Sequence, residues 1–350
     1  MLILVGATTA GIYFWSEYHL RAAENAIERY ALDEAKQHLD RCLIVRFRSA
    51  RVHLLAAQTA RRRDAYDEAE KHLTACVQLQ GKPEAVALER LLLTAQRGDL
   101  DDVEKLLKAR ADAKDAEAVL VLEALAKGYL SRFWKADAVA CLNKLLARQP
   151  RHPQAWLWRA RAWECLAASG ETERENDALS DYEKAVELEP SFEARLGLAG
   201  ALYRVGRPWD AMLEFEALLH LQAANPDAIL GLARCRYSLH EVDQAARLLD
   251  QLLEQQPDNA TALLERGRLA FHAGRLAEAE TWLRQAEAAA PLYDCDACRF
   301  LYQCLATLNK DEEARQCLDR LRQKETNVLR VDRLILQANR EPGNVALRRV

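Results

Sequence analysis

Four cysteines near the C-terminal end of the chain are the residues whose type and spacing could do chemistry. Cys295 and Cys298 form a CxxC pair, and Cys304 and Cys317 follow. Together they could supply four thiolate ligands to a zinc ion. The two later cysteines, however, follow at helical spacing rather than at the spacing of a zinc knuckle. We therefore expect buried structural thiols and no metal, with a thiol-metal protein that uses Cys295 and Cys298 as the weaker alternative.

The other polar residues form no recognisable catalytic pattern. The eight histidines occur singly, without an HExxH pair, and the glycines form neither a phosphate-binding loop nor a dinucleotide fingerprint. No nucleophile-elbow motif marks a serine triad. The nine cysteines are scattered along the chain, which favours free thiols in a reducing compartment over a disulfide framework. We predict that the protein is not an enzyme and has no cofactor.

The basic residues give little sign of a nucleic-acid partner. The net charge of −4 and the pI near 6.1 exclude a global basic footprint. Arg61, Arg62 and Arg63 form the only triple-basic run in the sequence. The run falls at the C-terminal end of a predicted helix, where cations complement the helix dipole. We expect a helix end stabilised in this way, and contact with anionic lipid headgroups is the alternative if the chain is anchored nearby.

The composition predicts an all-α fold to position these residues. Half of the residues are hydrophobic and 29% are charged, whereas only 9 prolines and 13 glycines are present. Strong helix formers dominate long stretches, and alternating β-branched runs, which mark strands, are absent.

A repeated pattern indicates how these helices are organised. A small residue is followed four positions later by a large apolar residue and, after three more, by a small or apolar residue. The residues that lead the nine copies are Ala35, Ala69, Val103, Ala138, Ala178, Ala211, Ala245, Ala279 and Ala314. They lie 34, 34, 35, 40, 33, 34, 34 and 35 positions apart. Such a period indicates stacked helical hairpins, which bury their apolar faces only against their neighbours.

Prolines and glycines punctuate the same period. Four copies are followed by a proline, which cannot continue a helix, at Pro150, Pro190, Pro257 and Pro291. Glycines fall where the first helix of a hairpin must end and the second begin, at Gly98, Gly206 and Gly274. The spacing of 40 comes from a polar insertion, Ala167 to Asn176, between the helices of the fifth repeat.

This pattern resembles the tetratricopeptide repeat, whose motif is W-x2-L-G-x2-Y in the first helix and A-x3-F-x2-A-x4-P in the second. The second-helix half is kept most fully in Ala178 to Pro190 and in Ala279 to Pro291. The first-helix half is looser, and the first three repeats lack the final proline. The resemblance covers residues 16–323 and implies an all-α solenoid, a superhelix of about nine stacked antiparallel hairpins that binds other proteins.

Residues 1–15 form an apolar N-terminal segment outside the repeats. Leu2 to Trp15 is uncharged and ends in aromatic residues, but it is shorter than the roughly 20 residues of a membrane span. Because the aromatics are typical of an interfacial belt, we predict a membrane anchor, with a signal peptide or a simple capping helix as alternatives. Arg21, Arg29 and Lys36 follow the segment, which places the solenoid in the cytoplasm.

Residues 324–350 interrupt the period at the other end. The stretch from Asn327 to Pro342 predicts a separate amphipathic helix, and the last eight residues, "GNVALRRV", look like the start of a further repeat. The chain is then expected to be a fragment or to continue.

The resemblance also implies a groove for a partner. In this family the concave face is lined by the second, fifth, ninth and twelfth positions of each first helix. The ninth and twelfth positions here hold Arg161, Tyr203, Arg234, Tyr237, Arg268 and Phe271. Arginines and aromatics on successive helices suit an extended acidic peptide, although the same residues could form a solvated face with interhelical salt bridges. The chaperone-binding branch uses a Lys and Asn clamp, and no Asn occupies a ninth position here.

We therefore predict a protein-interaction scaffold or adaptor that binds protein or peptide partners, associates with a membrane through its N-terminus and does not bind nucleic acid. Three alternatives remain. The chain could be a membrane-anchored regulator of envelope assembly, the repeat arm of a larger enzyme, or a thiol-metal protein that uses the CxxC pair.

Overall fold

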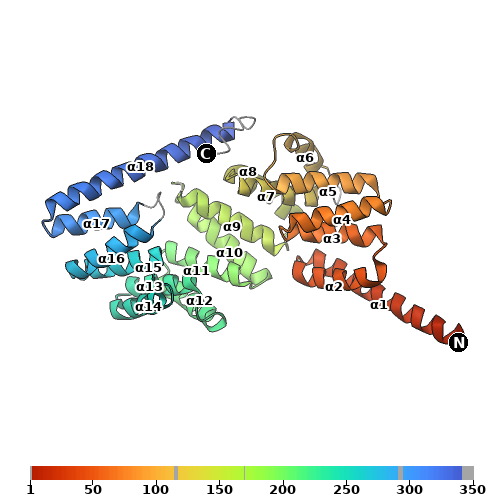
Figure 1. Cartoon of the computed structure of the whole chain (residues 1–350), viewed down its shortest axis with the longest axis horizontal. Coiled ribbons are helices and arrows are strands. Elements are labelled where there is room, and N and C mark those ends of the chain that lie inside the picture. Colours follow the sequence, from red (N-terminus) through yellow and green to blue (C-terminus); the bar gives the residue numbers. More distant parts are fainter. Residues whose placement is uncertain (1, 114–116, 169, 291–294, 341–350) are drawn as a thin grey trace. The chain divides into compact units, whose positions relative to one another are not determined.

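The computed structural model describes residues 2–113, 117–168, 170–290 and 295–340. Within these ranges the chain forms 18 helices and no strand (Figure 1). The helices belong to two compact units, Met1–Glu171 and Thr172–Val350. The predicted fold class, an all-α solenoid of stacked hairpins, is confirmed.

Each unit is a succession of helices joined by short turns. The first unit contains α1 (Leu2–Glu28), α2 (Leu32–Arg46), α3 (Ala50–Arg62), α4 (Tyr66–Gln78), α5 (Pro83–Gln96), α6 (Glu104–Ala111), α7 (Glu117–Ser131), α8 (Lys135–Arg148) and α9 (Pro153–Ala168). The second contains α10 (Arg174–Leu188), α11 (Phe192–Arg204), α12 (Pro208–Leu221), α13 (Pro226–Ser238), α14 (Val242–Gln255), α15 (Ala260–His272), α16 (Leu276–Ala289), α17 (Asp296–Thr307) and α18 (Asp311–Arg340). Odd-numbered helices are the first helices of the hairpins.

The predicted repeat pattern forms the core of both units. Every lead residue is buried, from Ala35 with no exposed surface to Val103 at 7%. The large residue that follows each lead residue by four positions packs between helices. This packing requires room, and hence a small residue, on the neighbouring helix. A β-carbon added at Gly197 would meet the Tyr182 ring at 2.2 Å, so the missing side chain makes this room. Close packing of large against small side chains therefore sets the distance between helices.

The turn inside each hairpin contains one residue with left-handed backbone. The three predicted glycines have φ angles of 73° to 89°. Gly170, in the insertion of the fifth repeat, has a φ of 114°. The other five repeats use a residue with a side chain at the matching place, namely Tyr30, Asp64, Phe133, His240 and Asn309. These residues bear the strain of a positive φ, which glycine avoids. Pro150, Pro190 and Pro257 follow the ends of second helices as predicted, whereas Pro291 lies outside the described residues.

The ends of the chain differ from the sequence prediction in one respect. α18 continues without a break from Asp311 to Arg340, so the separate helix expected after residue 323 is wrong. Residues 341–350, the expected start of a further repeat, lie outside the described residues. At the other end, α1 continues past residue 15 to Glu28, and its N-terminal part extends beyond α2 (Figure 1). Among the described residues, no helix has the length and apolar character that crossing a membrane requires.

The buried face of α18 also differs from the predicted phase. Ala314 and Leu321 are buried as expected, but Leu318 is only partly buried. Cys317, one position earlier, is fully buried in its place. A thiol, rather than the predicted leucine, therefore fills the core at this hairpin.

Candidate functional site

The first helices of the second unit lie side by side and position the predicted groove residues. α13 contacts α11 and α15, and α15 contacts α17. Asn225 and Asn259 fix the starts of α13 and α15, because their side chains accept hydrogen bonds from the backbone N–H groups of Ala228 and Ala262. These equivalent caps give the two helices the same phase.

Two predicted groove arginines meet at a carboxylate that sequence reasoning missed. Arg234 Nε lies 2.8 Å from Glu265 Oε1, and Arg268 Nη1 lies 3.1 Å from Glu265 Oε2. The Glu265 side chain is only 11% exposed, whereas those of Arg234 and Arg268 are 42% and 36% exposed. The three groups carry a net charge of +1. A signal was present, since Glu265 precedes Arg268 by three positions on the same helix.

Aromatic rings continue the same face. The Tyr237 ring stacks on His272 with centroids 6.0 Å apart, and His272 makes edge contacts with Phe271 and Phe300. The guanidinium carbon of Arg268 lies 5.0 Å from the centroid of the Phe300 ring, within cation–π distance.

Tyr203 extends this face onto α11. Its hydroxyl accepts a hydrogen bond from Ser238 Oγ at 3.3 Å. The groove strip is defined here as Tyr203, Arg234, Tyr237, Glu265, Arg268, Phe271, His272 and Phe300. It contains five of the six predicted groove residues. The sixth, Arg161, is exposed on α9, which belongs to the first unit.

The corresponding first helices of the first unit contain a buried charged network instead. Arg61 on α3 forms an ion pair with Glu89 on α5, and both side chains are almost completely buried. Arg62 Nη2 lies 2.9 Å from Glu123 Oε2 on α7. The predicted helix end is confirmed, because Arg61 and Arg62 lie in the last turn of α3. The burial of both side chains in ion pairs is a feature that the sequence did not indicate. Only Arg63 is partly exposed, and it pairs with Asp33 on α2.

The charges of this network are mutually compensating. Burial alone would raise the pKa of Glu123. The positive charges of Arg62 and Arg61 more than offset this effect, and the pKa of Glu123 lies below its ordinary value. The Tyr30 hydroxyl, in a left-handed turn, also donates to Glu123 Oε1 at 3.1 Å.

The histidines that look single in sequence form two pairs in space. His19 Nδ1 lies 2.7 Å from His38 Nδ1, and His53 Nδ1 lies 3.0 Å from His72 Nδ1. The pairs occupy equivalent places in the first two repeats, since corresponding members are 34 residues apart. This spacing is a signal that a search for short motifs misses.

Three of the four C-terminal cysteines, Cys298, Cys304 and Cys317, are buried thiols as predicted, and Cys295 is partly exposed. The Cys304 thiol donates to the carbonyl of Leu276 at 3.3 Å, as expected of a buried structural thiol. Cys298 and Cys317 approach each other, and Glu287 joins them. Among the described residues this trio is the one group of three side chains that could hold a metal ion.

Comparison with known proteins identifies the family. A family model described as tetratricopeptide repeat matches residues 121–166, 173–229 and 230–294. The chain is a tetratricopeptide repeat protein. The matched segments contain the groove strip up to α15, together with the hairpins that support it. Repeats of this family typically form scaffolds without enzyme activity.

Named relatives share only part of their length with this tetratricopeptide repeat protein. Protein CTR9 homolog of Arabidopsis thaliana is 28% identical over 133 residues, which cover 37% of this chain and 12% of that protein. Hsp70-Hsp90 organizing protein 2 of the same plant is 27% identical over 121 residues, covering 34% and 20%. The chain thus spans a small part of either relative.

A solved structure shows the same fold. The APC/C hetero-tetramer Cut9-Hcn1 matches with a TM-score of 0.53 and 16% identity, covering 84% of this chain and 57% of that chain. The repeats and the two Arabidopsis relatives support a protein-interaction scaffold.

Proposed function

We propose that this tetratricopeptide repeat protein is a scaffold that binds an extended acidic segment of a partner protein along the groove strip. The observation that carries the proposal is the shared contact of Arg234 and Arg268 with Glu265, beside a row of aromatic rings. We further propose that the protein has no enzyme activity, because repeats of this family typically form scaffolds without it.

The charge of the strip favours a carboxylate partner. A guanidinium carries five N–H donors, and contact with Glu265 uses only some of them. The trio keeps a net charge of +1, and both arginine side chains are accessible. Glu265 also holds the two guanidinium groups in place, which lowers the entropic cost of binding. A partner carboxylate would accept from the remaining donors, and its neighbouring side chains would pack on Tyr237 and Phe300.

The missing clamp residue argues against one specific partner. The name of Hsp70-Hsp90 organizing protein 2 refers to two chaperones. In this chain, however, no Asn occupies the ninth position of a first helix, where the chaperone clamp has one. We therefore propose an internal acidic segment rather than the C-terminus of a chaperone.

Paired charge reversals test this proposal. A partner recovered by crosslinking should bind the purified full chain, as measured by calorimetry, and Arg234→Glu with Arg268→Glu should abolish binding without changing helicity. The control is Arg247→Glu, an exposed arginine on the second helix α14, which should bind normally. Equal loss of binding in the control would exclude the groove strip as the site.

We also propose that the N-terminal end of α1 contacts a membrane surface and that the repeats face the cytoplasm. Tyr13, Phe14 and Tyr18 are all more than 60% exposed, which is unusual for three neighbouring aromatics. Aromatic side chains with a polar tip favour the headgroup region of a bilayer.

A further inference from the structure

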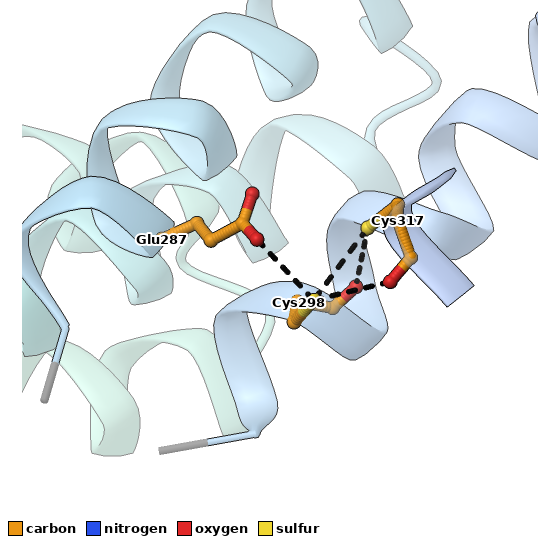
Figure 2. Close-up of side chains that lie close together, drawn as sticks. All are labelled: Glu287, Cys298 and Cys317. Carbon is orange, nitrogen blue, oxygen red and sulfur yellow. Dashed lines mark hydrogen bonds between the residues drawn. The ribbon is translucent and has the colours of Figure 1, made fainter. Parts of the chain in front are cut away.

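Three successive helices bring their side chains together near the C-terminal end of the second unit. Glu287 lies near the end of α16, Cys298 near the start of α17, and Cys317 in the second turn of α18. α17 packs against both α16 and α18. Figure 2 shows the carboxylate and the two thiols directed toward one another.

Two of the distances among the three ligand atoms are close to those of a small tetrahedral site. The two Sγ atoms are 3.6 Å apart, and Cys298 Sγ is 3.4 Å from Glu287 Oε1. Zinc binds sulfur at about 2.3 Å and carboxylate oxygen at about 2.0–2.2 Å, so tetrahedral geometry separates two sulfurs by about 3.8 Å and sulfur from oxygen by about 3.5 Å. All three atoms lie within 4.8 Å of one another. Shifts of a few tenths of an ångström to about 1 Å would complete the arrangement.

The charges around the site also suit a divalent cation. Arg320 Nε and Nη2 contact the two oxygens of Glu287 at 2.8 and 3.1 Å. Two thiolates and one carboxylate carry −3, Arg320 contributes +1, and an ion of charge +2 brings the sum to zero. Without a cation, the thiols must stay protonated. Burial, the neighbouring thiol and the carboxylate raise the pKa of Cys298 far above its ordinary value, and burial raises that of Cys317.

Access to the pair is possible from one side. Cys298 and Cys317 have no exposed surface, whereas the Glu287 side chain is 15% exposed. The carboxylate therefore connects the buried thiols to solvent. Three protein ligands leave one tetrahedral position for water.

We propose that Glu287, Cys298 and Cys317 form a binding site for a zinc-class divalent cation that joins α16, α17 and α18. The site is independent of the groove strip and of the proposed scaffold function. It differs from the CxxC site that was the weaker alternative from the sequence, because Cys317 and Glu287 lie with Cys298 in this group. Binding releases one proton from each thiol, and the ion forms bonds to two sulfurs and one oxygen.

Two alternatives to metal binding by the trio would give different experimental results. In the first, Cys298 and Cys317 are only hydrogen-bonded thiols, and no ion is needed. Each Sγ then donates to the carbonyl of the other residue, at 3.5 and 3.3 Å. As a redox pair, the thiols would lose two electrons and two protons to a peroxide or a disulfide oxidant and form an S–S bond. Thiols with raised pKa are poor nucleophiles for that reaction, and it gives no role to Glu287.

Titration of the reduced, metal-free full chain with Co²⁺ and Zn²⁺ tests the site. We expect one equivalent of Co²⁺ to bind with a thiolate-to-metal absorption band, Zn²⁺ to displace it, and about two protons to be released per ion. Zn²⁺ should also raise the melting temperature. Cys298→Ala and Cys317→Ala should lose the band. Glu287→Gln changes a side chain that is less buried than the two thiols, so the variant should keep its fold. It should keep the absorption band but bind Co²⁺ more weakly.

Cys304→Ala is the matched control, because Cys304 is equally buried on α17 but donates to Leu276. It should bind Co²⁺ as the wild type does. The proposal is overturned if the reduced wild type binds no Co²⁺, or if binding persists in the variant lacking both Cys298 and Cys317. It is also overturned if mass spectrometry of protein from cells shows a Cys298–Cys317 disulfide and the reduced chain binds no ion.

Discussion

The Arg61 guanidinium and the Glu89 carboxylate form an ion pair whose side chains are 0% and 2% exposed. Such a pair loses the hydration of two charges, and attraction between them offsets that cost only while both partners remain. Arg61 Nη1 also donates to Gln96 Oε1 at 2.8 Å, so the pair belongs to a larger hydrogen-bonded network.

Removal of one partner should therefore be costly. We expect Glu89→Ala to lower the free energy of unfolding by about 3–5 kcal/mol, because a buried guanidinium then lacks its counter-charge. The double variant Arg61→Leu with Glu89→Leu should lose much less, since neither charge of this pair is left buried without its partner. Urea denaturation of the full chain measures both. If the single variant is as stable as the double variant, the pair does not hold the network together.

The lead alanines make a second stability prediction. Ala245 is fully buried where α14 packs, and its neighbour Gln244 is exposed. Ala245→Leu should overpack the hairpin and lower the free energy of unfolding by about 1–3 kcal/mol. Gln244→Leu, the matched surface change, should cost little. Equal melting temperatures of the two variants would contradict the helical phase.

These residues show what the sequence can predict in this protein. The positions of Ala245 and of the turn glycines follow from a short-range pattern that recurs about every 34 residues, so the hairpins and their phase were predictable. The partners of Arg61 and Arg234 are 28 and 31 residues away, and no local pattern distinguishes a buried arginine from a solvated one. The predicted buried position on α18 was wrong, because Leu318 satisfies the motif as well as Cys317 does.

Histidine burial predicts how stability depends on pH. Burial lowers the pKa of His152, Arg62 lowers it further and Glu123 opposes the shift. Burial also lowers the pKa values of His19 and His72. The unfolded chain then binds more protons than the folded chain below the ordinary histidine pKa of about 6.5. The contribution of the histidines to stability should be constant above that pKa and fall as the pH drops below it.

Urea midpoints at about pH 7.5 and about pH 5.5 measure this dependence. His152 Nδ1 accepts from the Ala155 backbone N–H, so His152→Asn keeps the helix cap and removes the titrating group. The variant should lose less stability than the wild type at the lower pH. A wild type with equal midpoints at both pH values would show that the histidines do not contribute.

The proposed membrane contact predicts binding to vesicles. Tyr13→Ser with Phe14→Ser should weaken cosedimentation of the full chain by roughly tenfold or more, since each buried aromatic contributes about 1.5–3 kcal/mol. Phe47→Ser is the control, because Phe47 is equally exposed at the end of α2. If the control loses as much binding, or if the wild type does not bind vesicles, α1 is not the contact.

Glu265 decides how the groove strip works, because it could either compete with a partner or prepare the arginines for one. Glu265→Gln changes the net charge of the trio from +1 to +2 and frees guanidinium donors that now contact its carboxylate. If competition dominates, an acidic segment should bind roughly tenfold more tightly, since a charge-assisted hydrogen bond contributes about 1.5–3 kcal/mol and some of it is lost to solvent. The gain should shrink when the salt concentration rises, because part of the strip is exposed.

We expect tighter binding by Glu265→Gln, because Arg268 also contacts the Phe300 ring and does not depend on Glu265 alone for its position. Weaker binding by a fully folded variant, measured by calorimetry against wild type, would instead mean that the carboxylate orients both arginines and that preorganisation outweighs charge.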